Sequence, residues 1–345
     1  MCLINKKIYL RKELNPYELR TPLVPSDIKK LINSGYAIYV QSSCNRIFSD
    51  SEYENIGSEL TDLEWYNEKF KDHLIIGLKE LDNLDKLSNH THLYFSHSYK
   101  NQSGSENILN QFKKTKSKLY DFEYFLNSLN NRLISFGYYA GYVGGVLGLT
   151  QYFLKKNNLN LNNLSPFKSS NHLFNIIIDN NSQYNHQKIH IGLIGPNGKT
   201  GQGVQDILKN FGLDYQPIYT NTPKTNLVQY DILYNCICLD TEQNETWFDT
   251  YTLFEKNIII VDISCDYTKP NNPIKIYNSC TNWTNPVYKP NEYVDIISID
   301  NLPSLLPLDS SVYFSNLLLD LLINPEYNYI WEKNLNIFES KIKNI

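Results

Sequence analysis

The sequence predicts an α/β protein made of two doubly wound parallel-sheet domains separated by a cleft. Three observations support this prediction. Short apolar runs with strand character alternate with segments of helical periodicity in the first third of the chain, and the same alternation begins again near residue 187. A glycine-rich stretch with helical character, residues 136–156, joins the two regions. Strands that alternate with helices form parallel sheets, because each crossover helix returns the chain to the same end of the sheet.

Length and composition limit what the protein can be. Its 345 residues are enough for about two domains, each with its own core. The net charge of −4 provides no general attraction to nucleic acid or to an anionic membrane. No apolar segment follows the basic residues near the N-terminus, so we expect no secretory signal and a cytoplasmic protein. The six cysteines are scattered and suit neither a disulfide framework nor a metal site.

In the first region, predicted strands alternate with predicted helices. We predict strands at residues 6–13, 37–41, 74–78, 92–97 and 118–123. A helix that Ser26 would cap follows the first strand and ends at Gly35. Between the last two strands, Ile108, Leu109 and Phe112 recur at the spacing of one helix face.

The joining helix is unusual because it carries five glycines, Gly137, Gly141, Gly144, Gly145 and Gly148. One side of this helix is nearly bare, so another backbone could approach it closely. A phosphate-binding role is the alternative, but no suitable strand and turn precede these glycines. We therefore predict close helix packing at a domain junction.

The second region begins with the strongest local motif of the chain. A predicted strand at 188–195 leads through a turn into a helix, and four glycines mark this passage, Gly195, Gly198, Gly201 and Gly203. Such a turn lets the backbone approach a pyrophosphate, and the helix N-terminus offers N–H groups and a favourable dipole. The segment also imitates a P-loop, but Leu193 stands where that motif requires glycine. We therefore favour a dinucleotide over a nucleoside triphosphate.

The rest of the second region supports a sheet but leaves the choice of dinucleotide open. Further strands are predicted at 232–238, 257–264 and 294–300. Two helices, at 310–323 and 328–343, follow them, and these helices could return to the first domain. A dinucleotide fold usually holds the adenosine ribose with a carboxylate at the end of its second strand. That strand end, near Thr220, carries none, so both NAD and NADP remain open.

Two strands of the first region end in titratable side chains, Lys79 and His97. Strands of a parallel sheet present their carboxyl ends to a ligand crevice, so the two groups would be placed for proton transfer. The alternative is that Lys79 is a solvated charge and His97 a hydrogen-bonded structural residue.

The order of several segments resembles that of one enzyme family. These segments are RKELNPYELRTPLVP, LIIGLKE, YFSHSYKNQ, LYDFE, FGYYAG, the glycine turn, VDISCD and ISIDNLPSLLP. Together they resemble the lysine-forming saccharopine dehydrogenases, which belong to the wider alanine dehydrogenase-like group. The resemblance implies two Rossmann-like domains, a monomer, and NAD-dependent oxidation of saccharopine to L-lysine and 2-oxoglutarate, the last step of lysine biosynthesis through alpha-aminoadipate.

The resemblance also implies roles for single residues. Lys79 and His97 match the catalytic acid–base pair of the family. Arg20 matches a residue that holds a substrate carboxylate, which suits a guanidinium because it grips a carboxylate through two hydrogen bonds. Its alternative is a surface ion pair with Glu18. Further substrate contacts are matched by Gln102, Phe136, Ser264, Cys265 and Asp266.

Glu80 and Glu123 match carboxylates that lie beside the acid–base pair and tune its proton affinity. Cofactor contacts are matched by Gly195, Gly198, Lys199, Gly201, Arg132, Cys238, Ile263, Ile299, Asp300, Asn301 and Leu302. Five positions depart from the family: Asn131 replaces an arginine, Cys238 a tyrosine, Thr200 a cysteine and Asn15 a lysine, and Thr220 lies near the expected ribose-binding aspartate. These departures keep a degenerate, non-catalytic homologue open, beside a related amino-acid oxidoreductase.

The motifs and the resemblance together assign a role to each predicted domain. Residues 1–133 with about 308–345 are expected to form the substrate and catalytic domain, and residues 134–307 the dinucleotide-binding domain.

Overall fold

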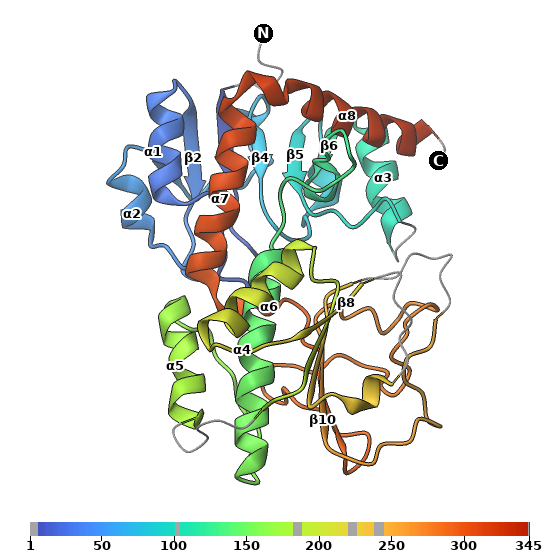
Figure 1. The fold of residues 1–345 in the computed structure, drawn as a ribbon. Helices are drawn as coiled ribbons and strands as arrows, with labels where there is room; N and C mark the ends of the chain where they lie inside the picture. Colours follow the sequence, from blue (N-terminus) through green and yellow to red (C-terminus); the bar gives the residue numbers. More distant parts are fainter. Residues whose placement is uncertain (1–5, 101–103, 182–187, 220–225, 238–244, 344) are drawn as a thin grey trace. The chain divides into compact units, whose positions relative to one another are not determined.

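The protein is described by a computed structural model that covers residues 6–100, 104–181, 188–219, 226–237, 245–343 and 345. The chain divides into two compact units (Figure 1). Unit 1 comprises residues 1–135 and 307–345, and unit 2 comprises residues 136–306. Each unit is built on one parallel sheet, which confirms the predicted fold class.

Among the residues described, the sheet of unit 1 has six strands in the order β3-β2-β1-β4-β5-β6, all paired in parallel. The strands are β1 (Lys7–Leu10), β2 (Ala37–Gln41), β3 (Glu59–Thr61), β4 (Leu74–Ile76), β5 (Thr91–Tyr94) and β6 (Lys118–Asp121). The strand order reverses between β1 and β4, and ligands of doubly wound sheets bind beyond the carboxyl ends of the strands at such a point.

Helices cover this sheet. They are α1 (Pro25–Asn33), α2 (Asp50–Glu54), α3 (Ser105–Lys114), α7 (Pro307–Ile323) and α8 (Asn328–Lys343). Short 3₁₀ segments lie at Glu68–Phe70, Leu84–Lys86, Phe122–Tyr124 and Pro325–Tyr327. The two C-terminal helices belong to unit 1, where α7 packs on α1, and α8 packs on β6 and α3.

The predicted cap of α1 is wrong. The helix begins at Pro25, and Val24 rather than Ser26 occupies the capping position. Hydroxyl groups from α7 support this end instead: Ser315 accepts a hydrogen bond from the Val24 N–H (3.0 Å) and donates one to Asp27 (2.7 Å). A partner 291 residues away in the sequence cannot be predicted from the local pattern.

Within the described part of unit 2, the sheet has five parallel strands in the order β11-β10-β9-β7-β8. They are β7 (Ile191–Ile194), β8 (Gln216–Ile218), β9 (Ile232–Asn235), β10 (Ile258–Asp262) and β11 (Val294–Ile297). Its helices are α4 (Gly137–Lys156), α5 (Ser170–Asn181) and α6 (Lys199–Asn210), with 3₁₀ segments at Leu227–Gln229 and Leu302–Leu305. The strand order reverses between β7 and β9. β3, α2 and α5 have no counterpart among the predicted elements.

The glycines of α4 allow two helix backbones to touch, as predicted, but the predicted place is wrong: the partner is α6 of the same unit and not an element across a domain junction (Figure 1). A side chain at Gly141 would overlap the Thr200 carbonyl group, and one at Gly203 would overlap the Tyr138 carbonyl group. This contact lies at the N-terminus of α6, directly behind the glycine turn.

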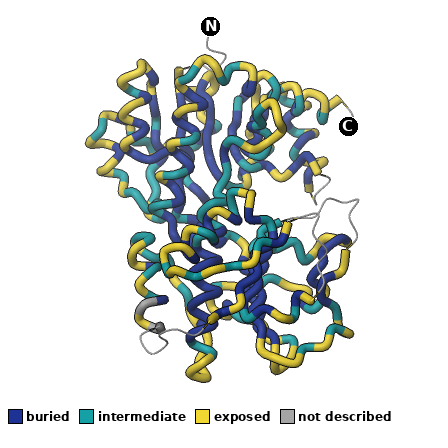
Figure 2. Tube along the Cα trace, in the orientation of Figure 1, coloured by how far each residue is buried: buried dark blue, intermediate teal, exposed yellow. Residues whose placement is uncertain are grey.

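Each sheet forms the core of its unit, and the strands run as buried segments in Figure 2. Large aromatic side chains fill the unit 1 core, including Tyr9, Trp65, Phe70, Phe112 and Phe338. In unit 2, side chains of α4, α6 and the strands form one continuous apolar cluster. Among the described residues, no helix combines the length and the apolar character needed to cross a membrane.

Candidate active site

The carboxyl ends of the unit 1 strands carry a group of titratable side chains. Glu13 follows β1, Lys79 follows β4, His97 follows β5 and Glu123 follows β6. Because the strands are parallel, all four lie toward the same edge of the sheet. The order reverses between β1 and β4, so Lys79 follows a strand that borders the switch point.

Lys79 is half-buried in the turn after β4. Backbone hydrogen bonds from Gly77 to Leu93 (3.1 Å) and from Phe95 to Leu78 (3.1 Å) keep this turn against the end of β5. The charge of Lys79 acts on the buried carboxylate of Glu18 and contributes to lowering the pKa of that group. Lys79 is therefore electrostatically linked to the Arg20 site.

His97 is presented to solvent by the backbone around it. It has a φ of 52°, an uncommon conformation for a residue other than glycine. The neighbouring Ser96 and Ser98 are buried and hydrogen-bonded to each other, and Ser96 also bonds to Asp121 (2.5 Å). With both neighbours held inward, the imidazole remains 43% exposed, and its Nδ1 lies 3.9 Å from Glu123 Oε1.

Glu123, which follows β6, lies beside two positively charged side chains. Its carboxylate lies 2.9 Å from Lys100 Nζ and 3.3 Å from Arg132 Nη2. Burial alone would raise the pKa of Glu123, but Arg132 and Lys100, with a contribution from His97, outweigh burial and lower it. Glu123 is therefore a carboxylate held ionised beside His97, and Arg132 is placed with this cluster in unit 1.

Arg20 and Glu18 form an ion pair, but the pair is buried rather than on the surface. Arg20 donates from Nε to Glu18 Oε1 (2.7 Å) and from Nη2 to Oε2 (2.6 Å). Burial would raise the pKa of Glu18, yet the charge and hydrogen bonds of Arg20 hold it below its usual value. The two-pronged geometry fixes the plane of the guanidinium.

A small hollow in unit 1 adjoins this pair and brings together three guanidinium groups. It is lined by Arg11, Glu13, Glu18, Arg20, Thr21, Pro22, Ser43 and Arg46. Each of the three guanidinium groups already lies within 3.8 Å of a carboxylate of the chain, so their charges are balanced within unit 1. Arg11, Glu13 and Arg46 were not among the predicted site residues. The sequence feature that could have identified Arg11 and Glu13 is RKE, the charged end of the first predicted strand. It stands directly before the segment that carries Arg20.

The glycine turn of unit 2 fits a pyrophosphate. Gly195 follows β7 with a φ of 78°, and Gly198 occupies the capping position of α6, where among the described residues no side chain caps the helix. A Cβ at Gly201 would lie 2.8 Å from Pro196 Cα, so only glycine permits this contact between turn and helix. At Gly198 the nearest atom to such a Cβ is 3.8 Å away, which leaves the backbone accessible. These are the features by which a helix N-terminus holds the phosphates of NAD.

The same turn argues against a P-loop. Leu193, which stands at the position of its first glycine, is a buried residue of β7. A P-loop protein also needs an acidic residue for magnesium, and the candidate at the end of β10, Asp262, is buried. It accepts hydrogen bonds from Asn235, Ser264 and Tyr277. Burial raises the pKa of Asp262. It is a hydrogen-bonded structural carboxyl group.

Other predicted residues follow the strands of unit 2. Ser264, Cys265 and Asp266 form the turn after β10, and residues 299–302 follow β11. Cys265 Sγ lies 2.6 Å from Cys280 Sγ, and burial raises the pKa of both thiols. The side chain of Ile263 lies against Gly144 of α4.

Of the remaining predicted residues, two lie within the described part of the chain. Phe136 lies directly before α4, and Glu80 is exposed after Lys79. Gln102, Cys238 and Thr220 lie outside the described residues.

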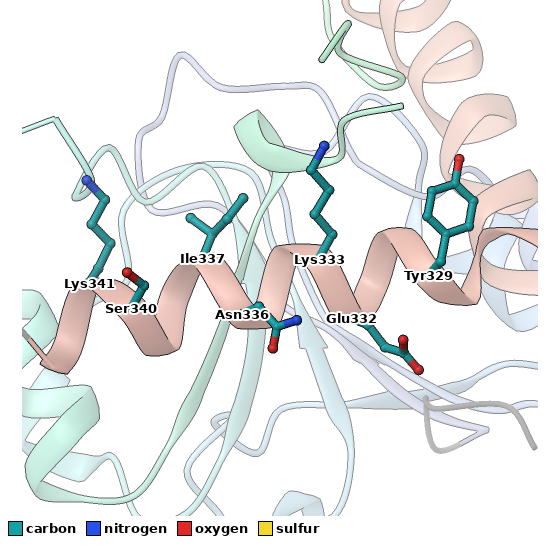
Figure 3. A pocket seen from close by; sticks show the side chains of 7 residues that line it. All are labelled: Tyr329, Glu332, Lys333, Asn336, Ile337, Ser340 and Lys341. Atoms are coloured by element: carbon teal, nitrogen blue, oxygen red, sulfur yellow. The ribbon is translucent and has the colours of Figure 1, made fainter. Parts of the chain in front are cut away.

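A surface groove along α8 is not a second candidate site (Figure 3). Its two lysines already hold neighbouring segments: Lys333 donates to Asn130 Oδ1 (2.9 Å), and Lys341 donates to the Tyr99 carbonyl group (2.8 Å). None of the predicted site residues that the structure describes lines this groove.

Comparisons with known proteins first define the class. The sequence model of the alanine dehydrogenase/PNT N-terminal domain matches residues 9–143. An L-alanine dehydrogenase structure covers 96% of this chain and is itself covered to 93%, with a TM-score of 0.69 and 13% identity. A transhydrogenase from Sinorhizobium meliloti gives a TM-score of 0.66 at 12% identity, with 92% of each chain covered. The fold is that of the alanine dehydrogenase-like proteins.

Sequence relatives then define the family. Saccharopine dehydrogenase [NAD(+), L-lysine-forming] of Candida glabrata is 35% identical over 335 residues, which cover 90% of each protein. The enzyme of the same name from Emericella nidulans is 31% identical over 366 residues, which cover 98% of each. A stretch of 134 residues is also 31% identical to mitochondrial alpha-aminoadipic semialdehyde synthase of Mus musculus, covering 39% of this chain and 14% of that protein. The chain belongs to the lysine-forming saccharopine dehydrogenase family.

Proposed function

We propose that this protein oxidises saccharopine with NAD and releases L-lysine and 2-oxoglutarate, as the last step of lysine biosynthesis through alpha-aminoadipate. The observation that carries the proposal is the similarity to saccharopine dehydrogenases over nearly the whole chain. Lys79 and His97 at the ends of adjacent parallel strands support it, because the reaction requires several proton transfers.

The substrate explains the kinds of side chain gathered in unit 1. Saccharopine is a secondary amine that carries three carboxylates. NAD, when bound, accepts a hydride from the carbon on the glutamate side of that amine. The resulting imine adds water, and the adduct separates into a primary amine and a ketone. The protein must therefore hold carboxylates, accept the amine proton and activate water.

Lys79 and His97 divide the proton transfers in this proposal. Lys79 accepts the proton of the secondary amine, and His97 activates the water and returns protons as the adduct separates. Glu123, held ionised beside His97, favours the charged imidazolium that forms when water is deprotonated. Glu80 is proposed to act on Lys79 in the same way, through its negative charge. Arg20 holds a substrate carboxylate, with Gln102 and Phe136 as further contacts.

Unit 2 is proposed to bind NAD. The turn formed by Gly195, Gly198 and Lys199 would hold the pyrophosphate at the N-terminus of α6, with Gly201 allowing the tight turn. The segments after β10 and β11 would line the remainder of the cofactor and substrate site, with Ile263 and residues 299–302 on the cofactor and Ser264, Cys265 and Asp266 on the substrate. Arg132 and Cys238 are further proposed cofactor contacts.

The decisive experiment follows NADH formation from saccharopine and identifies the products. We expect stoichiometric L-lysine and 2-oxoglutarate, with NAD preferred over NADP. NADH formation from alanine but not from saccharopine would favour an alanine dehydrogenase-like amino-acid oxidoreductase. NADH binding without any turnover would favour a degenerate homologue. We also propose a cytoplasmic monomer, which size-exclusion chromatography with light scattering and cell fractionation would test.

Replacement of Arg20 by alanine is expected to raise KM for saccharopine and to destabilise unit 1. The stability loss at neutral pH should be about 3–5 kcal/mol, because Glu18 would remain buried without its partner. KM comes from NADH kinetics, and stability comes from urea unfolding. An unchanged KM would remove Arg20 from the substrate site.

The stability loss should depend on pH. Because the folded state lowers the pKa of Glu18, the ion pair stabilises the fold above the pKa of an unfolded-state glutamate, and this contribution disappears as the pH falls through the lowered value. The difference between wild type and Arg20→Ala should therefore shrink as the pH falls from neutral through the lowered pKa of Glu18. Arg20→Lys, which keeps the charge but not the two-pronged geometry, is the matched variant.

A further inference from the structure

We propose that Arg11 and Glu13 form a clamp that positions Lys79 for proton transfer. Neither residue has a role in the function proposed above, and the inference rests on that function only for the role of Lys79. The clamp consists of two oppositely charged side chains from the end of β1 that bind the backbone of the turn after β4.

Glu13 holds the N–H side of this turn. Its Oε1 accepts a hydrogen bond from the Leu78 N–H (2.7 Å), and its Oε2 accepts one from the Lys79 N–H (2.9 Å). The carboxylate is almost fully buried, with 6% of the side chain exposed. Two backbone donors on one buried carboxylate are strong, charge-assisted hydrogen bonds.

Arg11 holds the carbonyl side. Its Nη2 donates to the Lys79 carbonyl oxygen, and 2% of its side chain is exposed. The guanidinium lies directly over Gly77, where any side chain would overlap it, and 5.8 Å from the centre of the Tyr94 ring. Gly77 is therefore needed so that Arg11 can reach past the end of β4.

The two contacts bind the N–H and the carbonyl group of the same residue. β4 ends at Ile76, so the sheet itself no longer holds the backbone at Lys79. The clamp fixes the position of the Lys79 Cα. Its hydrogen bonds involve only backbone atoms of Lys79 and do not engage the ammonium group. Since a displacement of about 1 Å can cost about 10²-fold in rate, a fixed backbone at this point matters for turnover.

Glu13→Gln tests the clamp, because glutamine offers one acceptor where the turn presents two N–H donors. We expect kcat for saccharopine to fall about 10- to 100-fold, with the Kd of NADH unchanged. The matched control is Asp27→Asn, which alters another buried carboxylate of unit 1 that bonds α7 and Lys30 rather than the turn. It should leave kcat unchanged. Should Glu13→Gln fail to fold, Arg11→Lys tests the carbonyl side and should also lower kcat.

A double variant separates positioning from general stability. In the Lys79→Met background, Glu13→Gln should have almost no further effect on the remaining turnover, because the residue it positions is gone. A loss as large as in the wild-type background would overturn the clamp, and so would a folded Glu13→Gln enzyme with normal kcat.

Amide hydrogen exchange tests the clamp without any activity. Peptides that cover Leu78 and Lys79 should exchange faster in Glu13→Gln than in wild type and in Asp27→Asn. Unchanged exchange would overturn the clamp whatever the substrate. If exchange accelerates but wild type does not oxidise saccharopine, the clamp on the turn stands and the proposed function fails.

Discussion

Replacement of Lys79 by methionine is expected to lower kcat for saccharopine oxidation by about 10²- to 10⁴-fold, the usual contribution of one positioned acid or base. Methionine keeps an unbranched chain of similar length, so the half-buried turn after β4 should retain its packing. The measurement is initial-rate NADH formation at saturating saccharopine, combined with a thermal melt.

Lys86→Met provides the control for this variant. Lys86 is another lysine of unit 1, about half exposed and 3.3 Å from Asp85, and it has no proposed part in the reaction. Its removal should leave kcat and the melting temperature unchanged, because surface substitutions away from special features have small effects. Wild-type turnover in Lys79→Met would remove Lys79 from the acid–base role.

Replacement of Gly201 by alanine is expected to disrupt the turn that precedes α6. The new methyl group would lie 2.8 Å from Pro196 Cα and would overlap the Gly195 carbonyl oxygen, and neither backbone atom can rotate away. Stability should fall by about 1–3 kcal/mol, as for other overpacked sites. The Kd of NADH should rise about tenfold or more, equivalent to about 1.4 kcal/mol, because the N–H groups at the helix N-terminus would be displaced.

Gly198→Ala separates the shape of the turn from access to the cofactor. Gly198 has φ −77° and ψ 161°, which any residue adopts, and the nearest atom to an added Cβ is 3.8 Å away. Its melting temperature should match wild type, while the Kd of NADH should rise if the pyrophosphate passes over this residue. An equal loss of stability in both variants would contradict the steric argument, and an unchanged Kd in both would remove the turn from the cofactor site.

Much of this architecture could be predicted because it depends on short-range patterns. Apolar runs such as LIIGL and NIIIVDIS predict buried parallel strands, and the glycines around Gly198 predict a tight turn before a helix. The glycine face of α4 predicts close packing because only a missing side chain allows two backbones to touch. Lys79 and His97 could be placed at strand ends for the same local reason.

The sequence pattern predicted less well where partners are distant in the chain. Ser26 has the right residue type for a helix cap, yet the capping position lies two residues earlier, at Val24, and is supported by Ser315 of α7. The pairing of Arg20 with Glu18 follows from their spacing, but its burial depends on the packing around it. That burial turns a weak surface ion pair into one whose loss is costly.

Taken alone, the order of residues along this chain establishes its class of fold, its glycine turn and the chemical types available for proton transfer, because these depend on local periodicity and on side-chain chemistry. It does not reveal that Arg11 and Glu13 hold the backbone of Lys79, or that Arg132 and Lys100 keep Glu123 ionised. Most of those contacts join segments that follow different strands, β1 with β4 and β5 with β6. They exist only once the parallel sheet has brought these ends to one edge, where burial strengthens each charge and hydrogen bond.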